Sequence, residues 1–122
     1  MTITPKMQVE WFHLMFLRLF SNHMQANLYA IKGGYNLRLF FDSIRYSEDL
    51  DIDIQITQKS TLENKVNKLL LSPALLKLLQ GYQITKISYS SPKQTQTTQR
   101  WKIQLHTSRS VMPLPTKIEF SR

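Results

Sequence analysis

The segment from Asp49 to Ile56 alternates strictly along the chain, and this pattern constrains the fold more than any other feature. Its acidic residues occupy every second position, namely Asp49, Asp51 and Asp53. The positions between them are apolar, namely Leu50, Ile52, Ile54 and Ile56. Successive side chains of a strand point to opposite faces, so the pattern predicts a half-buried strand with one acidic face. The fold must therefore contain a sheet that carries carboxylates on one side.

Apolar residues at helical spacing predict helices on both sides of this strand. The pattern from Met7 to about Asn27 predicts a packing helix, and Tyr35–Phe41 predicts a shorter one. Ser60 and Glu63 have the spacing of a capping box, so a further helix is expected to start at Ser60.

The next segment predicts either a second short helix or a kink in the same one. Ser72 is followed by Pro73, which is the pattern of an N-cap with proline at the first helical position. Gly81 is expected to close the helical segment.

The remaining segments have β character. Leu28–Ile31 is a short apolar run before a glycine turn, and three later segments also predict strands, namely Tyr82–Tyr89, Arg100–Thr107 and Thr116–Phe120. The polar stretch Ser90–Gln99 is expected to be a hairpin loop. The order α-β-α-β-α-β-β-β predicts an α+β fold, with a mixed β-sheet and helices packed on one face. We expect one domain over residues 1–122.

Charge and composition favour a polyanionic partner. The net charge is +8 with a pI near 9.9, although a generically basic surface is equally compatible with these values. There is no cysteine, so disulfides and thiolate zinc sites are excluded. The apolar run Trp11–Phe20 is too short to span a membrane and includes His13 and Arg18. We expect a cytoplasmic protein without a membrane anchor.

The acidic strand is the strongest candidate for chemistry. Asp49 and Asp51 lie two residues apart on one face, where their oxygens can jointly hold hard divalent cations. A calcium loop is excluded, because the required glycine position is Ile54. A solvated outer strand face remains an alternative, and such a face needs a nearby cation. His13 and His23 are ten residues apart, which favours structural roles over metal binding.

Two motifs next to one another give a family resemblance. Residues 32–40 read KGGYNLRLF, and residues 45–53 read RYSEDLDID. Together they resemble the first two motifs of AbiEii-type nucleotidyltransferases, in which K-G-G-T-x-L-x-L precedes R-x-S-x-D-[LI]-D. Lys117–Phe120 extends the resemblance to a third acidic strand. These proteins are toxins of abortive-infection and type IV toxin–antitoxin systems, with a polymerase-β-like nucleotidyltransferase core. Tyr35-Asn36 departs from the family, which usually has a small residue there.

The resemblance implies roles for particular residues. Asp49 and Asp51 match the metal-binding pair, and Glu119 would be a third carboxylate that binds Mg²⁺ or takes a proton from the attacking hydroxyl. A two-metal site is therefore expected. Lys102 would neutralise phosphate charge. The residues expected near the triphosphate of the NTP are Lys32, Gly33, Gly34, Arg38, Arg45 and Ser47.

The resemblance also implies a function. The implied reaction is transfer of an NMP from an NTP to an acceptor hydroxyl of RNA, and tRNA is the expected acceptor. The protein would act as a toxin that a partner antitoxin restrains. Family members continue into a helical C-terminal domain, whereas this chain stops three residues after Glu119, so we expect a truncated or minimal version. Two alternatives stay open: an inactive remnant that binds nucleic acid or an antitoxin, and nucleotidylation of a small molecule.

Overall fold

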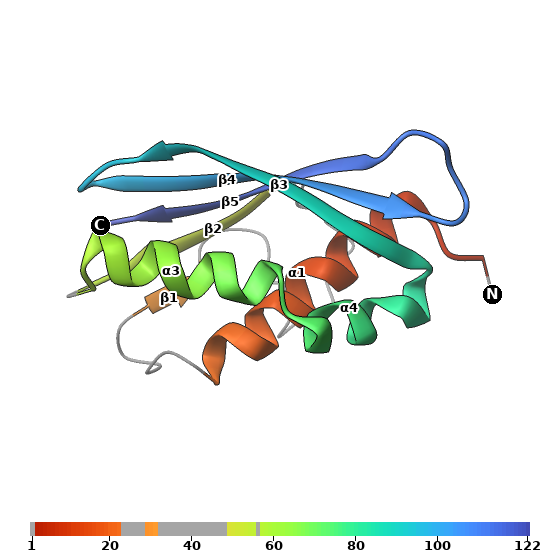
Figure 1. Cartoon of the computed structure of the whole chain (residues 1–122), viewed down its shortest axis with the longest axis horizontal. Helices are drawn as coiled ribbons and strands as arrows, with labels where there is room; N and C mark the ends of the chain where they lie inside the picture. Colours follow the sequence, from red (N-terminus) through yellow and green to blue (C-terminus); the bar gives the residue numbers. More distant parts are fainter. Residues whose placement is uncertain (1, 23–28, 32–48, 56) are drawn as a thin grey trace.

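A mixed sheet forms one layer of the molecule, and helices form the other (Figure 1). The structure is a computed structural model that describes residues 2–22, 29–31, 49–55 and 57–122. Its strands are β1 Tyr29–Ile31, β2 Asp49–Ile54, β3 Ile84–Gln94, β4 Thr98–Thr107 and β5 Leu114–Ser121. Its helices are α1 Pro5–Ser21, α3 Lys59–Leu70, α4 Pro73–Leu79 and the 3₁₀ turn η2 Gln80–Tyr82.

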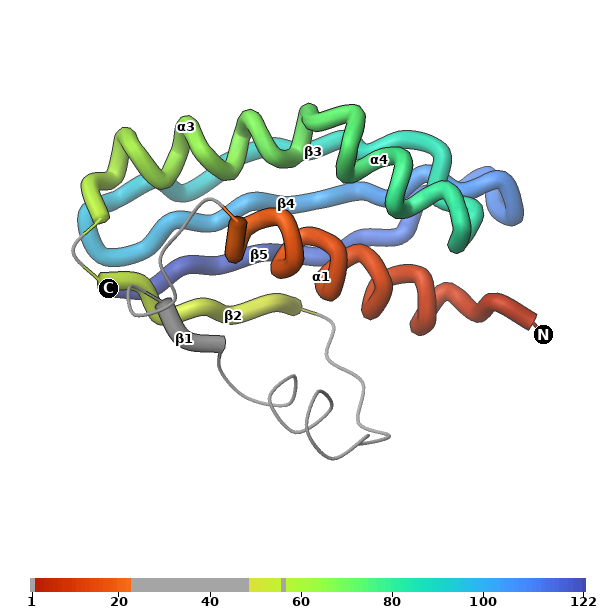
Figure 2. Tube along the Cα trace, turned by 90° about the horizontal axis from the view of Figure 1, so that it is seen from below, coloured from red at the N-terminus to blue at the C-terminus, as the bar shows by residue number. Residues whose placement is uncertain are grey.

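The strands follow the order β1-β2-β5-β4-β3 across the sheet. β2 and β5 pair in parallel at the centre, and the other pairings are antiparallel. Figure 2 shows α1, α3 and α4 on the same side of the strands. The predicted α+β class, with helices on one face of a mixed sheet, is therefore confirmed. Among the described residues, no helix has the length and apolar character that a membrane span requires.

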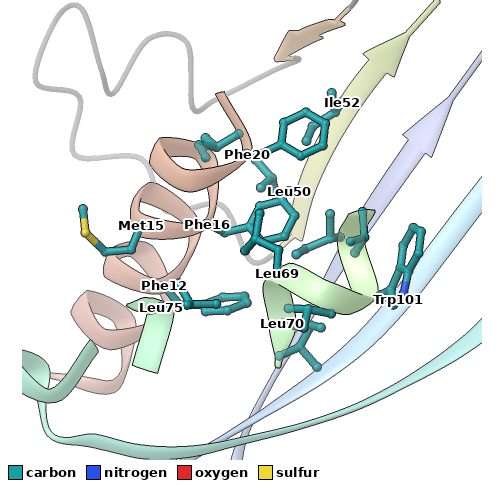
Figure 3. Packing of buried hydrophobic residues seen from close by; sticks show 14 of the residues in the cluster. Phe12, Met15, Phe16, Phe20, Leu50, Ile52, Leu69, Leu70, Leu75 and Trp101 are labelled. Atoms are coloured by element: carbon teal, nitrogen blue, oxygen red, sulfur yellow. The ribbon is translucent and has the colours of Figure 1, made fainter. Parts of the chain in front are cut away.

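The core lies between the helices and the inner face of the sheet (Figure 3). α1 contributes a ladder of aromatic rings at helical spacing, and Phe12, Phe16 and Phe20 are each at most 1% exposed. Phe20 packs on Phe120 of β5 with ring centroids 5.4 Å apart. Trp101 of β4 meets the same ring edge-on at 5.7 Å. Aromatic burial of this kind supplies much of the driving force that fixes α1 over the central strands.

The helix starts follow local capping chemistry, with one correction to the sequence prediction. Thr4 caps α1 by accepting a hydrogen bond from the Met7 amide, and Pro5 occupies the first turn. Ser72 caps α4 as predicted, with a hydrogen bond from the Ala74 amide. The capping box at Ser60 is wrong, because α3 already begins at Lys59 and its N-cap, Gln58, makes no side-chain cap bond.

The helical segment also ends differently from the prediction. The chain divides into α3 and α4, which is the two-helix alternative. Gly81 does not close α4, because the backbone continues through η2 beyond Leu79. The left-handed residue is instead Gln83, with φ of 63°, and its amide donates to the carbonyl of Gln80. The reversal into β3 is therefore made two residues later than expected.

The predicted hairpin loop Ser90–Gln99 is wrong, because most of it is strand. β3 runs to Gln94 and β4 starts at Thr98, so only a short turn joins them, closed by a bond from the Thr95 amide to the Thr98 carbonyl. β3 is the outermost strand of the sheet. An edge strand tolerates polar side chains, a bulge and a proline such as Pro92. A register shift between Ser90 and Lys93 accommodates that proline.

Some predictions concern residues outside the described part of the chain. These are the extension of the first helix to Asn27, the helix Tyr35–Phe41 and the glycine turn Gly33-Gly34. α1 itself ends at Ser21, with Asn22 as its C-cap.

Candidate functional site

The acidic residues of β2 face away from the helices. Leu50, Ile52 and Ile54 are at most 1% exposed in the core, and the alternation of the strand places the aspartates on the other side. We call this side of the sheet the open face. The predicted acidic face is thus confirmed by the burial pattern of β2, and it is the side opposite the buried core.

The third predicted carboxylate lies beside this acidic strand. β2 and β5 run in parallel, and Asp51 is the register partner of Glu119. Neighbouring strands are about 4.8 Å apart, and alternate residues of one strand are about 7 Å apart. Asp49, Asp51 and Glu119 therefore form a compact triangle of acidic positions on the open face. The family resemblance implied that Glu119 lies on an adjacent strand, and the pairing of β2 with β5 agrees with that position, while the role of Glu119 stays a prediction.

Basic residues adjoin these acids on the same face. Lys117 of β5 is the register partner of Asp49, and Lys102 of β4 is the register partner of Lys117. Arg100 of β4 is the register partner of Glu119. The position predicted for Lys102, on the strand next to Glu119, is therefore confirmed in space, while its role in neutralising phosphate stays a prediction.

Two ion pairs supply counter-charge to the acids of the open face, one at Asp49 of β2 and one at Glu119 of β5. Arg100 Nε donates to Glu119 Oε2 at 2.6 Å, with side chains 33% and 29% exposed. Lys117 Nζ lies 3.5 Å from Asp49 Oδ2, with side chains 45% and 38% exposed. The first is a short, charge-assisted bond, whereas the second is a looser contact exposed to solvent.

The three carboxylates share a face but are not gathered around one point. Within the described residues, no group of three histidine, aspartate or glutamate side chains is close enough to hold a metal ion. Asp49 and Glu119 are turned towards Lys117 and Arg100 instead. The donor set consists of hard oxygens, which suits Mg²⁺. The metal site stays a prediction.

A hollow of about 410 Å³ adjoins the acidic edge of the open face. Asp49 and Lys117 line one side of it, and Lys102 and Gln104 line the side formed by β4. Such a volume is within the range of small-molecule sites. The hollow therefore brings a candidate metal ligand and two lysines to one concave surface.

A buried histidine lies below this region, on the helix side of the sheet. His13 of α1 is fully buried, and its Nε2 lies 2.7 Å from the Thr116 hydroxyl of β5. Burial lowers the pKa of His13 from 6.5 to about 3, because the imidazolium would lose its hydration. His13 is thus a neutral structural residue, as its spacing from His23 suggested.

Most residues predicted to contact the triphosphate lie outside the described part of the chain. They are Lys32, Gly33, Gly34, Arg38, Arg45 and Ser47. The residue that the sequence analysis missed is Arg100, the bonded partner of Glu119. The sequence did indicate the face on which Arg100 lies, because Arg100 and Lys102 are two residues apart in an alternating segment and therefore share a face.

Comparison with known proteins identifies the family. The family model described as Nucleotidyl transferase AbiEii toxin, Type IV TA system, matches residues 15–122. The chain belongs to this family. The match includes β2, β4 and β5, so it covers every described candidate residue of the AbiEii site. Comparison with curated protein sequences gives no match.

Two crystal structures from Helicobacter pylori share the fold of this AbiEii chain. The protein JHP933 is 18% identical, with a TM-score of 0.63 over 98% of this chain and 45% of that chain. A candidate nucleotidyltransferase is 20% identical, with a TM-score of 0.53 over 89% of this chain and 43% of that chain. The AbiEii chain thus spans less than half the length of either structure. These likenesses show the fold.

Proposed function

We propose that this AbiEii chain transfers a nucleoside monophosphate from an NTP to an acceptor hydroxyl of RNA, with tRNA as the expected acceptor. One observation carries the proposal. Asp51 and Glu119 are register partners on neighbouring parallel strands, and Asp49 lies two residues from Asp51 on the same open face. Family membership supports the reaction class, and the net charge of +8 supports a polyanionic acceptor.

The carboxylates would hold divalent cations, with Mg²⁺ as the expected ion. Asp49, Asp51 and Glu119 offer only hard oxygen ligands, which Mg²⁺ prefers. Two such ions, when bound, stabilise charge on the attacking and leaving oxygens of an in-line displacement. The ion pairs of Asp49 and Glu119 must open for these ligands to converge.

The chain's own basic residues then have a second task. Lys117 and Arg100, released from their carboxylates, lie next to Lys102 on the open face, where they would attract the triphosphate. In the reaction the acceptor oxygen forms a bond to the α-phosphorus. The bond between the α-phosphorus and the oxygen that bridges it to the β-phosphate breaks, and pyrophosphate leaves. Glu119 would either bind the ion or take the proton of the acceptor hydroxyl.

We infer that the protein acts as the toxin of a toxin–antitoxin pair, with the antitoxin as its protein partner. Membership of the AbiEii family of type IV toxin–antitoxin systems supports this role. A second candidate is a binding module without catalysis. It is favoured by the ion pairs that engage Asp49 and Glu119, and by the absence of a gathered three-carboxylate group among the described residues.

A transfer assay separates these candidates. The purified chain is incubated with Mg²⁺, each labelled NTP in turn and bacterial tRNA. Asp51→Asn removes the carboxylate that faces Glu119, and Asp53→Asn is the matched control, because its register partner is Ser121. We expect labelling by the parent and by Asp53→Asn. Labelling by Asp51→Asn should fall by roughly a hundredfold or more, since metal stabilisation is worth several kcal/mol.

The other outcomes are equally decisive. Full labelling by Asp51→Asn would contradict the carboxylate assignment. Absence of labelling with all three proteins, while they still bind RNA, would support the binding module instead. Thermal melting of each protein checks the fold, and Asp51 is exposed, so its replacement should leave stability within about 0.5 kcal/mol.

A further inference from the structure

The open face carries a second hollow beside the first one. This hollow has a volume of about 280 Å³, and Ser88, Ser90, Lys102 and Gln104 contribute to its lining. Lys102 and Gln104 also line the 410 Å³ hollow that includes Asp49. The two hollows are therefore neighbours on the open face, with Lys102 and Gln104 common to both.

Two rows of register partners cross the open face here, and the first row contributes residues to both hollows. One row consists of Asp49, Lys117, Lys102 and Ser90. The other consists of Asp51, Glu119, Arg100 and Lys93. Each row crosses three gaps between strands of about 4.8 Å, which gives a length of roughly 14 Å. That length corresponds to roughly four stacked nucleotides at about 3.4 Å each.

The sign of the charge changes along the rows. The β2 end is acidic, β5 contributes one lysine and one glutamate, and the β4 positions are Arg100 and Lys102. β3 and β4 contain no aspartate or glutamate. Lys93 and Lys102 are both exposed on this surface. A phosphate chain is therefore attracted to β3 and β4 and repelled by the acids of β2.

We propose that the β3–β4 part of the open face binds the sugar-phosphate backbone of a single-stranded nucleic acid and directs its reactive end to Asp49 and Asp51. We call this surface the acceptor track and define it by Ser90, Lys93, Lys102 and Gln104. The inference rests on the proposed transfer function and names the path of its acceptor. Neither the family description nor the sequence motifs assign Ser90, Lys93 or Gln104.

The length of the track favours a polynucleotide over a lone triphosphate. Lys93 lies at the outermost strand, three strands from the acids of β2. A triphosphate whose α-phosphorus reacts at the carboxylates has no phosphate left to reach that edge. Lys93 and Lys102 provide the phosphate contacts, while Ser90 and Gln104, the neighbours of Lys102 on β3 and β4, provide neutral hydrogen-bonding groups.

The experiment measures RNA binding without catalysis. Binding of a fluorescent single-stranded oligouridylate to the full chain is followed by anisotropy in EDTA, without NTP, over a series of salt concentrations. The test variant is Lys93→Gln with Lys102→Gln. The matched control is Lys68→Gln with Lys77→Gln, which removes the same charge from exposed positions on α3 and α4.

The expected difference follows from counterion release. The slope is that of the logarithm of the binding constant against the logarithm of the salt concentration. Each lost phosphate contact lowers its magnitude by about 0.7 for a single strand, so two lost contacts lower it by about 1.4. The same relation gives about tenfold weaker binding at 0.15 M salt for the track variant. The control should stay within about twofold of the parent, because charges more than a Debye length of about 8 Å away are screened.

Three results would overturn the track. The first is that both double variants weaken RNA binding equally, and the second is that the parent binds no RNA. The third is that ATP displaces the RNA from the parent but not from the track variant. The last result would assign these lysines to the triphosphate. If the track variant alone loses RNA binding while the parent shows no nucleotidyl transfer, the proposed function fails and the acceptor track stands.

Discussion

Stability of this chain should decline in mild acid because of one buried histidine. In the folded chain the pKa of His13 is lowered to about 3, and its ordinary value is 6.5. Between these two pH values the unfolded chain binds one more proton than the folded chain at this position. The contribution of neutral His13 to the free energy of unfolding is therefore fully present above pH 6.5, and it is lost progressively as the pH falls towards 3.

The size of the loss follows from the same pKa values. Well below pH 6.5, each pH unit removes about 1.4 kcal/mol from the free energy of unfolding. Lowering the pH from 7.5 to 5.0 should therefore remove about 2 kcal/mol through His13 alone. For a domain with a total stability of about 5–15 kcal/mol, that is a substantial share.

The matched variant is His13→Gln, because a glutamine amide can take the place of Nε2 opposite the Thr116 hydroxyl without titrating. Urea unfolding of both proteins is followed by the fluorescence of the buried Trp101 at pH 7.5 and 5.0. The parent should lose about 2 kcal/mol more than the variant over this interval. Equal losses, or an imidazole that titrates near pH 6.5 in the folded chain, would refute the reasoning.

Two further predictions concern packing and capping. Phe16→Ala should lower the free energy of unfolding by about 3–5 kcal/mol, because the ring is 0% exposed. Leu71→Ala should change it by less than about 0.5 kcal/mol, because Leu71 is 70% exposed. Ser72→Ala should cost about 1 kcal/mol, because the Ala74 amide loses its cap. Urea unfolding measures all three. Equal effects of Phe16→Ala and Leu71→Ala would contradict the core assignment, and an unchanged Ser72→Ala protein would contradict the cap.

The sequence predicted the elements whose pattern is local. The alternation from Asp49 onwards defined both the strand β2 and its acidic face, because a period of two leaves only one way to bury three isoleucine and leucine side chains. Ser72 and Pro73 similarly defined the start of α4, since capping depends on residues within one turn. In both cases the decisive interactions join residues close together in the sequence.

Where tertiary context decides, the sequence was a poor guide. The polar residues from Ser90 to Gln94 looked like a loop, but they belong to the edge strand β3, whose open face can be polar because none of the described helices covers it. The parallel pairing of β2 with β5 joins residues more than sixty positions apart, and no local pattern encodes it. The ion pair of Arg100 with Glu119 depends on strand register and was missed for the same reason.

The two ion pairs of the open face explain how an acidic cluster can exist in the folded chain. Without Lys117 and Arg100, adjacent carboxylates at Asp49, Asp51 and Glu119 would repel one another across the strands. Both bonds are partly exposed, so each contributes little net stability and can be replaced at small cost. A cation that binds the carboxylates would release both basic side chains for phosphate. The same basic residues thus offset the repulsion between the carboxylates and, in the proposed function, would bind the phosphates of the substrate, which links the electrostatics of folding to the proposed chemistry.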